Sequence, residues 1–289
     1  MYILIVILIL IVIATVIEMI REQFVFKVRH YEIHSSKLNN VNDELKIVFI
    51  SDLHGHEYGQ NNCRLLQSIS EIQPDLILSG GDMIVGKKDY DCTKVIRFVR
   101  ELCKIAPVFC ANGNHEERMK LFPEKYGNIY EPYKQELLKA GVTCIENESC
   151  VFNKNNISIV VTGVELPMEC YAHRGLKKIK TEQITEKIGY ADETKYNILL
   201  AHHPAYMEHY KEWGADLTLS GHLHGGVVRI PGLGGVVSPQ MGLFPKYSGG
   251  YFSEGRMDFV VSRGLGTHTI NVRLFNQAEL IVLHVKGEK

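Results

Sequence analysis

The sequence lacks an excess of charge of either sign. Its 289 residues include 32 Lys and Arg against 33 Asp and Glu, for a formal net charge of -1. Proteins that bind nucleic acid usually carry a clustered excess of Lys and Arg on one surface. The densest basic cluster here, residues 174–180, is short, and it predicts a solvated helix face. The charge balance therefore argues against nucleic acid as a partner.

Repeats, low-complexity segments and linkers are also missing between residues 41 and 289. Their absence argues against a repeat array. The composition, 45% hydrophobic and 22% charged, is that of an ordinary globular protein and argues against collagen or a disordered chain. We therefore expect residues 45–289 to form one folded domain with a buried core.

The cysteines lack the spacing of a disulfide framework. There are seven, an odd number, and none lies in a C-x-x-C pair. Free cysteine behaves as a small buried hydrophobic residue, and unpaired thiols are typical of a reducing compartment. We expect all seven to be reduced thiols: Cys63, Cys92, Cys103, Cys110, Cys144, Cys150 and Cys170.

One long hydrophobic run is present, at the N-terminus. Residues 1–17 are apolar except for Thr15. A helix rises about 1.5 Å per residue, so this stretch spans roughly 25–30 Å, about one hydrocarbon core. No basic segment, A-x-A-like cleavage site or twin-Arg pair accompanies it. The run therefore predicts an uncleaved, single-pass membrane anchor over residues 1–20.

Charged residues next to this anchor predict its orientation. Arg21, Lys27 and Arg29 follow the apolar run. They lie in residues 21–44, which we assign as a juxtamembrane segment that includes a first strand. The positive-inside rule places the flank that is richer in Lys and Arg in the cytoplasm. A domain on the cytoplasmic face of the cell membrane is therefore expected, and a signal anchor with the domain outside is the alternative.

Strand and helix patterns alternate through the first half of the domain. The strand-like patterns are residues 46–50, 75–78 and 107–111. The helical patterns between them are residues 61–72 and 93–102. The second half contains more strand-like runs and fewer helical ones. Alternating units followed by strand-rich sequence predict a layered α/β/β/α sandwich of two mixed sheets.

Polar side chains with metal-binding chemistry follow the ends of these strands. Groups beyond the carboxyl ends of strands in an α/β sheet converge on one site. Carboxylate, amide and imidazole groups without thiolate suit Mn, Fe, Zn or Ni. In D-x-H and G-H-x-H we expect both side chains to lie on one side of an extended segment. The motifs are Asp52-Leu53-His54, Gly81-Asp82, Gly113-Asn114-His115-Glu116, the lone His202, and Gly221-His222-Leu223-His224.

The order of these five motifs resembles the calcineurin-like metallophosphoesterase superfamily, over most of residues 45–285. Further segments resemble its membrane-tethered bacterial branch, which includes phosphodiesterases and UDP-diacylglucosamine pyrophosphatases. These segments are residues 74–77, residues 221–226 with Arg229, Pro231 and Gly235, and residues 262–266. Residues 273–279 depart from the branch, because they lack the Pro-Glu usually seen after the asparagine.

The resemblance implies a centre of two divalent metal ions, which the donor set limits to Mn, Zn, Fe or Ni. Two ions about 3.5–4 Å apart can polarise a phosphoryl oxygen and activate a bridging water. Asp82 would contribute to both ions. The implied ligands of the first metal are Asp52, His54, Asp82 and His224, and those of the second are Asp82, Asn114, His202 and His222.

The resemblance also implies roles for residues that bind no metal. His115 would stabilise the phosphoryl group or protonate the leaving oxygen. Glu116 is expected to orient His115, with a surface carboxylate as the alternative. Arg263 is either a phosphate-binding fork or a turn arginine that caps backbone carbonyls. His203 should point away from the metals, because adjacent residues on an extended segment face opposite sides.

Together these features predict a membrane-anchored, metal-dependent phosphohydrolase, a phosphodiesterase or pyrophosphatase that uses a metal-activated water. The anchor favours lipid-linked or envelope-derived phosphoesters, because it raises their local concentration. Two alternatives remain, a metal-stabilised scaffold without catalysis and a nuclease. His115 argues against the scaffold, since a scaffold needs no general acid, and the charge balance argues against the nuclease.

Overall fold

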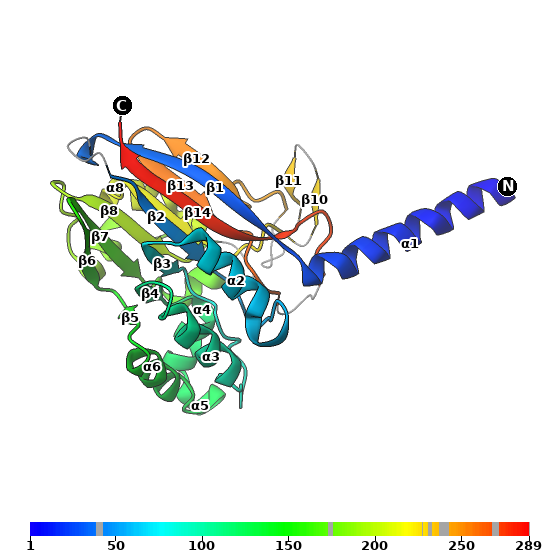
Figure 1. The fold of residues 1–289 in the computed structure, drawn as a ribbon, viewed down its shortest axis with the longest axis horizontal. Helices are drawn as coiled ribbons and strands as arrows, with labels where there is room; N and C mark the ends of the chain where they lie inside the picture. The colour runs from blue at the N-terminus through cyan, green and yellow to red at the C-terminus, as the bar shows by residue number, and fades with distance from the viewer. Residues whose placement is uncertain are drawn as a thin grey trace.

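Two six-stranded mixed sheets pack face to face in the computed structural model (Figure 1). The structure describes residues 1–38, 43–172, 176–226, 228–230, 233–236, 243–267 and 272–288. Pro231 and residues 174–175 of the basic cluster lie outside these ranges. Helices cover the outer face of each sheet, so the predicted α/β/β/α sandwich of two mixed sheets is confirmed.

The first sheet has the strand order β1-β14-β2-β3-β4-β5. Its strands are β1 (Phe26–Ser35), β14 (Ala278–Gly287), β2 (Leu45–Ile50), β3 (Leu76–Ser79), β4 (Val108–Ala111) and β5 (Thr143–Ile145). β14 pairs with β2 in the antiparallel sense, and the other neighbours are parallel. β1 pairs with β14 along its whole length, so the predicted first strand forms one edge of this sheet.

The second sheet has the strand order β12-β13-β9-β8-β7-β6. Its strands are β12 (Gly250–Glu254), β13 (Met257–Val261), β9 (Leu217–Ser220), β8 (Tyr196–Ala201), β7 (Ile157–Val164) and β6 (Ser149–Lys154). The central strands β13, β9, β8 and β7 are parallel to one another, and the outer pairs are antiparallel hairpins. A separate two-stranded ribbon consists of β10 (Arg229–Ile230) and β11 (Gly234–Gly235).

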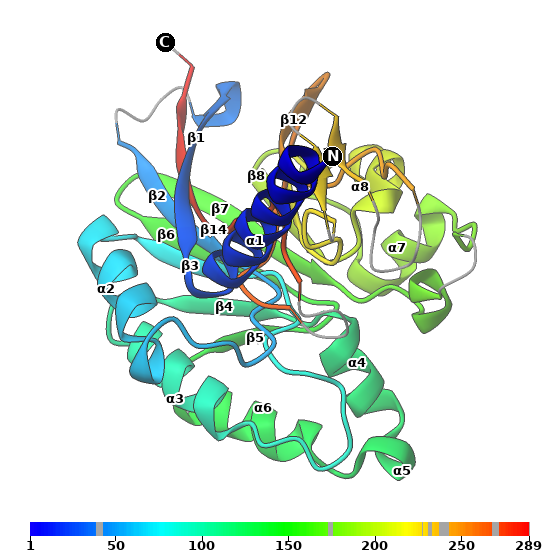
Figure 2. The same ribbon diagram turned by 90° about the vertical axis from the view of Figure 1, so that its right-hand side faces the viewer.

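The helices lie in two outer layers, as Figure 2 shows. On the first sheet these are α2 (Cys63–Ile72), α3 (Thr93–Leu102), α4 (Asn114–Leu121), α5 (Pro123–Tyr126) and α6 (Tyr130–Lys139), and on the second sheet α7 (Thr181–Ile188) and α8 (Met207–Trp213). Short 3-10 turns are η1 (Ser36–Leu38), η2 (Gln60–Asn62), η3 (Met168–Tyr171) and η4 (Pro204–Tyr206). The sequence did not predict α4, α5 or α7. The basic cluster was expected on a helix, but its residues 176–180 precede α7 and are not helical.

The core consists of three apolar clusters, one at each interface between layers. Successive side chains of a strand point to opposite faces, so one strand serves two clusters. In β2, Val48 and Ile50 face the helices, whereas Ile47 and Phe49 face the second sheet. The third cluster lies between the second sheet and the helices α7 and α8. Short apolar runs buried on both faces are therefore correctly interpreted as central strands.

Helix α1 (Tyr2–Phe24) projects from the domain (Figure 1). It extends beyond the predicted anchor of residues 1–20 and is long and apolar enough to cross a membrane. At about 1.5 Å per residue, its 23 residues span about 35 Å. Glu22, in the last turn, is buried against the domain. Helix α1 is therefore a candidate membrane span whose C-terminal turn packs on the domain.

The strand register places the end of α1 and the carboxyl ends of the central strands at the same end of the molecule. Phe26, just after α1, pairs with Ala278 at the start of β14. β2 runs antiparallel to β14, and Phe49 near its carboxyl end pairs with Ile281. The loops after β2 and the neighbouring parallel strands therefore lie on the side of the domain from which α1 projects.

Candidate metal centre

The loops after five parallel strands carry the seven predicted metal-ligating side chains, and all seven are buried. Asp52 and His54 follow β2, Asp82 follows β3, Asn114 follows β4, His202 follows β8, and His222 and His224 follow β9. Six of them fall into groups whose ligand atoms lie within 4.8 Å of one another. The seventh, Asn114, begins α4 beside His115, whose backbone N–H donates to Asp82 Oδ1 at 2.8 Å.

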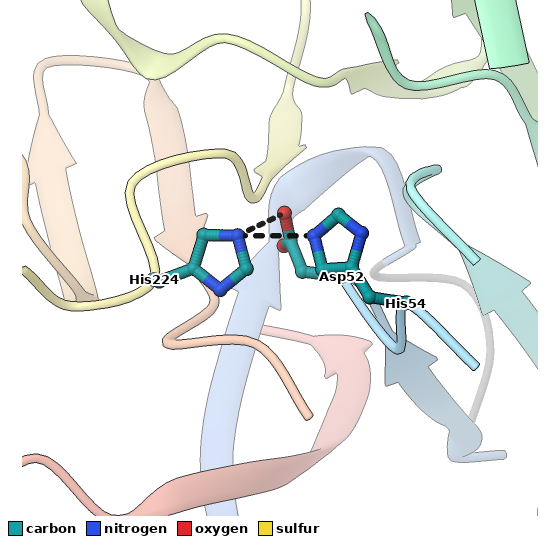
Figure 3. A group of neighbouring side chains, drawn as sticks. All are labelled: Asp52, His54 and His224. Carbon is teal, nitrogen blue, oxygen red and sulfur yellow. Dashed lines mark hydrogen bonds and ion pairs between the residues drawn. The ribbon is translucent and has the colours of Figure 1, made fainter. Parts of the chain in front are cut away.

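The first group contains Asp52, His54 and His224 (Figure 3). His224 Nε2 lies 3.2 Å from His54 Nε2 and 3.4 Å from Asp52 Oδ1. Asp82 completes the group, with Oδ2 3.9 Å from His54 Nε2. Two imidazoles and two carboxylates thus point their ligand atoms at one another, which is a suitable donor set for a first-row divalent cation.

The second group contains Asp82, His202 and His222. Asp82 Oδ2 lies 3.1 Å from His202 Nε2. Two further ligand atoms, Asn114 Oδ1 and His222 Nε2, are buried and have no hydrogen-bond partner among the described residues. Buried polar atoms are nearly always paired, so two such atoms beside a buried carboxylate indicate a bound group. These residues fit a second divalent cation.

Backbone carbonyls orient two of the histidine rings. His202 Nδ1 lies 2.8 Å from Gly80 O, and His224 Nδ1 lies 3.0 Å from Gly266 O. A carbonyl only accepts, so the neutral form of each ring carries its proton on Nδ1 and offers the Nε2 lone pair to a cation. Neutral imidazole with a free Nε2 is the form that binds metal.

The carboxylate of Asp52 is also held from two sides. The Ser51 hydroxyl donates to Oδ2 at 2.6 Å, and the backbone N–H of His222 donates to Oδ1 at 3.0 Å. A Cβ on Gly221 would lie 2.2 Å from Asp52 Oδ2, so only glycine allows the loop after β9 to approach this closely. The loops after β2 and β9 are therefore in direct contact through Asp52.

Five of the predicted ligands have a left-handed backbone conformation. Asparagine, aspartate and histidine adopt it more readily than other non-glycine residues, yet each instance costs about 1–3 kcal/mol. Such strain is concentrated at functional sites. The expectation that D-x-H and G-H-x-H would be extended is therefore wrong, because the side chains converge through tight turns. The φ angles are 53° for Asp52, 50° for His54, 54° for Asp82, 68° for His222 and 50° for His224.

Burial shifts the pKa values of several site residues. It raises the pKa of Asp52 to about 6, because the charged carboxylate has been removed from water. Burial and the neighbouring His203 lower the pKa of His222 well below its usual value, which favours the neutral ring. Burial also acts to raise the pKa of Asp82, but the facing histidines, His202 first, outweigh it and lower that pKa. A divalent cation would stabilise both carboxylates in their charged form.

His115 lies beside the first group. Its Nδ1 accepts a hydrogen bond from the Gly86 N–H at 2.7 Å, so the neutral ring carries its proton on Nε2. That Nε2 lies 3.9 Å from Asp82 Oδ2, and the ring centroid lies 4.8 Å from that of His54. The donor N–H of His115 therefore points toward the candidate ligands.

Glu116 holds the loop of Asp82 through its backbone, and its expected role in orienting His115 stays a prediction. Its Oε2 accepts from Asp82 N at 2.8 Å and Gly113 N at 3.0 Å, and its Oε1 accepts from Met83 N at 2.8 Å and Ile84 N at 3.1 Å. Four backbone donors thus converge on one buried carboxylate. The side chain is buried, so the surface alternative is wrong.

Arg263 and His203 have contacts that the sequence analysis did not predict. Arg263 Nε lies 3.6 Å from Oε2 of the buried Glu279, a carboxylate contact that neither interpretation of this arginine included. The ring centroid of His203 lies 4.5 Å from that of His222, so His203 packs against a candidate ligand, while His202 is the member of the ligand group, as expected. Its Nδ1 accepts a hydrogen bond from the Ala205 N–H.

Asn276 is a site residue that the sequence analysis did not single out. Its side-chain amide donates to the carbonyl of His224 at 2.6 Å and to that of Gly226. It lies in the segment 273–279, which was noted only for its departure from the branch. An asparagine has many uses, and no spacing rule connects it to a histidine that lies 52 residues earlier.

Comparison with known proteins identifies similar sequences. The family model described as calcineurin-like phosphoesterase matches residues 45–226. The uncharacterized metallophosphoesterase YkuE of Bacillus subtilis is 26% identical over 269 residues, which cover 92% of this chain and 87% of the relative. The phosphodiesterase YaeI of Escherichia coli is 28% identical over 246 residues, covering 83% of this chain and 82% of YaeI. The UDP-2,3-diacylglucosamine pyrophosphatase LpxG of Chlamydia muridarum is 22% identical, covering 83% of each chain.

Proposed function

Because the chain belongs to the calcineurin-like phosphoesterase family and is a hydrolase of phosphoester bonds, we propose that it is a membrane-anchored phosphodiesterase or pyrophosphatase with a two-metal centre. The observation that carries the proposal is the position of Asp82. Its Oδ2 faces His54 of the first group at 3.9 Å and His202 of the second at 3.1 Å. One carboxylate is thus available to both cations.

The proposed ligands divide between the two sites. Asp52, His54, Asp82 and His224 would bind the first cation, and Asp82, Asn114, His202 and His222 the second. Two divalent ions, when bound, polarise the phosphoryl group and lower the pKa of a bridging water. The orphaned Asn114 Oδ1 and His222 Nε2 support the second site, because a cation would satisfy both atoms.

His115 supplies a hydrogen-bond donor in this proposal. Its Nε2 carries the proton because Nδ1 accepts from the Gly86 N–H. The Nε2–H can therefore donate a hydrogen bond that stabilises charge on the phosphoryl group, and the Gly86 N–H keeps the ring oriented. Arg263 remains a candidate for contact with the phosphoryl group, but its pairing with Glu279 favours a structural role.

The preference for diesters or pyrophosphates rests on relatives. YaeI is named a phosphodiesterase, and LpxG is named a UDP-2,3-diacylglucosamine pyrophosphatase. Both substrate classes have a phosphoryl group with two substituents. A lipid-linked compound of this kind is the proposed substrate class, because an anchored enzyme meets membrane-borne esters at high local concentration. The near-zero net charge argues against nucleic acid as that diester.

We assign α1 as a single-pass anchor with the domain on the cytoplasmic face. Arg21, Lys27 and Arg29 follow the apolar segment, which supports this orientation. All seven cysteines lie in the described part of the chain and are free thiols there, which suits a reducing compartment.

The proposal is tested with the full-length protein in detergent. Metal content is measured alongside hydrolysis of bis-p-nitrophenyl phosphate and p-nitrophenyl phosphate with Mn, Zn, Fe or Ni. About two metal ions per chain and a faster reaction with the diester are expected. Asp82→Asn should lose metal and activity, whereas His115→Ala should retain metal and lose about 10²–10⁴-fold in turnover.

A matched control and three contrary outcomes complete the test. His209→Ala, in α8 outside the site, should leave both metal content and turnover unchanged. Metal binding without cleavage of either ester would favour the scaffold. Faster cleavage of the monoester would contradict the diester preference alone. Cleavage of nucleic acid with binding that depends steeply on salt would favour the nuclease.

A further inference from the structure

In the part of the chain that the structure describes, five large apolar side chains outside α1 are exposed on short segments near the metal-ligand loop. They are 41% to 70% exposed, whereas the apolar side chains of the core are buried. A soluble surface tolerates scattered apolar residues, but a gathered group marks a binding surface. We call these residues the apolar rim: Ile230, Leu233, Leu243, Phe244 and Phe275.

Backbone hydrogen bonds connect the segments of the rim. The N–H of Arg229, next to Ile230, donates to Leu274 O at 3.1 Å, and Leu274 precedes Phe275. The N–H of Phe244 donates to Val236 O at 2.9 Å, just after β11. The rim is therefore one surface formed by chain segments that support one another.

The rim is also attached to the loop of His224. The guanidinium of Arg229 donates to Gly225 O at 2.9 Å, directly after this candidate ligand. A Cβ on Gly235 of β11 would lie 2.5 Å from the same carbonyl oxygen. The β10–β11 ribbon thus packs on the metal-ligand loop, and the rim lies next to the site.

The last turn of α1 contacts the same region. Glu22 Oε2 accepts a hydrogen bond at 3.1 Å from the N–H of Asn276, the residue after Phe275. Figure 1 shows β10 and β11 on the side of the domain from which α1 projects, and Figure 2 shows the same side facing the viewer. The apolar helix and the apolar rim therefore meet at one end of the molecule.

Two aromatic residues of the rim are held in a strained conformation. Phe244 has φ 48° and Phe275 has φ 54°, in the left-handed region that bulky side chains seldom adopt. Each instance costs about 1–3 kcal/mol, and such strain is concentrated at functional positions. Both rings are nevertheless exposed, so burial within this chain does not offset the strain. A surface that covers these rings would offset it.

We propose that the apolar rim rests in the interfacial layer of the bilayer that α1 crosses, which places the metal site at the level of the lipid headgroups. The inference rests on the proposed anchor. A bilayer is the occupant that continuity favours, because α1 is exposed along its apolar length and its last turn is bonded to Asn276, next to Phe275 of the rim. Leucine and phenylalanine side chains are typical of surfaces that lie in this layer.

This placement has a consequence for the substrate. A phosphoester carried on a lipid has its scissile bond in the headgroup layer. With the rim embedded, that bond would reach the metal site without the lipid leaving the membrane. The rim therefore supports a lipid-linked substrate more directly than the anchor alone, because it brings the metal site to the headgroup layer.

The test uses tryptophan fluorescence of the full-length protein in phosphatidylcholine nanodiscs. The chain has one tryptophan, Trp213, which provides the background emission. Leu233→Trp and Leu243→Trp are compared in nanodiscs with and without bromine on acyl carbons 6 and 7. Leu138→Trp, at an exposed position of α6 on the other side of the domain, is the matched control. The rim tryptophans should lose at least a third of their emission, and the control should lose none.

Two results would overturn the inference. Leu233→Trp and Leu243→Trp could be quenched no more than Leu138→Trp, which would place the rim in water. They could also show blue-shifted emission without quenching, which would mean that a protein surface covers the rim.

Hydrolysis of bis-p-nitrophenyl phosphate by the same samples separates the proposed activity from the proposed position of the rim. Quenching without hydrolysis would contradict the proposed activity alone, and hydrolysis without quenching would contradict the rim alone.

Discussion

Glu22 and Asn276, 254 residues apart in the sequence, are joined by a hydrogen bond of 3.1 Å from the Asn276 N–H to Glu22 Oε2. The side-chain amide of Asn276 in turn donates to the carbonyl of His224. One residue thus connects the last turn of α1 to the backbone of a candidate metal ligand. The candidate membrane helix and the candidate metal centre are in this way connected through one residue.

Substitution of Asn276 should weaken the metal centre. Asn276→Ala removes the donor to His224 O and Gly226 O, and the loop of His224 loses its support. Loss of such a partner typically costs 10- to 100-fold in metal affinity or activity, and we expect this range in a chelator competition. kcat should fall more than KM rises.

Two variants separate positioning from general destabilisation. Gln277→Ala, at the next position, should leave metal affinity unchanged. Glu22→Gln keeps an oxygen that accepts from the Asn276 N–H, so its effect should be several-fold smaller than that of Asn276→Ala. Equal metal affinities for Asn276→Ala and Gln277→Ala would contradict the positioning role.

Glu116→Gln should destabilise the fold and distort the loop of Asp82. The carboxylate accepts from four backbone N–H groups, and a glutamine side chain has only one oxygen to offer. Leaving buried donors unpaired costs about 1–3 kcal/mol each, so urea unfolding should show a loss of at least about 1 kcal/mol. Glu124→Gln on the exposed surface is the control, and an equal effect of both changes would refute the argument.

The stability of the protein should depend on the protonation of Glu117. Burial, and then the charge of Glu165, raises the pKa of Glu117 from 4.5 to about 8. Between these values the unfolded chain releases the proton that the folded chain keeps. The free energy of unfolding therefore falls as pH rises, by up to about 1.4 kcal/mol per pH unit.

Glu117→Gln removes this dependence. Urea unfolding at pH 5 and pH 8 should show a smaller fall in stability for the variant, and at pH 8 the variant should be the more stable protein. Glu131→Gln, at an exposed position, should reproduce the pH profile of the unmodified chain. A profile for Glu117→Gln that parallels the unmodified one would mean that Glu117 is already charged in the folded state.

Cys63 offers a test of orientation. It is a free and exposed thiol at the start of α2. With the domain in the cytoplasm, a maleimide that cannot cross membranes should label Cys63 only after spheroplasts of an expressing bacterium are permeabilised. Cys63→Ser should remove this labelling of the permeabilised spheroplasts. Labelling of intact spheroplasts that this substitution abolishes would place the domain outside.

Local sequence determined much of the fold and the composition of the site. Apolar runs of strand length and side chains at helical spacing depend on near neighbours, and α3 begins and ends at the predicted residues 93 and 102. The order of the polar motifs predicted which residues approach one another, because each motif follows a parallel strand and such strands end on one side. Helix α4 was missed because its sequence, NHEERMKL, has few apolar residues to show the period.

Only the tertiary structure decided how these residues meet. The left-handed conformations of Asp52 and His224 are imposed by contacts between loops, and no local pattern predicts them. Glu116 finds its four donors mainly on a loop more than 30 residues away. The bond from Glu22 to Asn276 exists because β1 and β14 pair along the edge of the first sheet, which joins the two ends of the chain. Spacing along a sequence carries no information about partners that only sheet formation brings together.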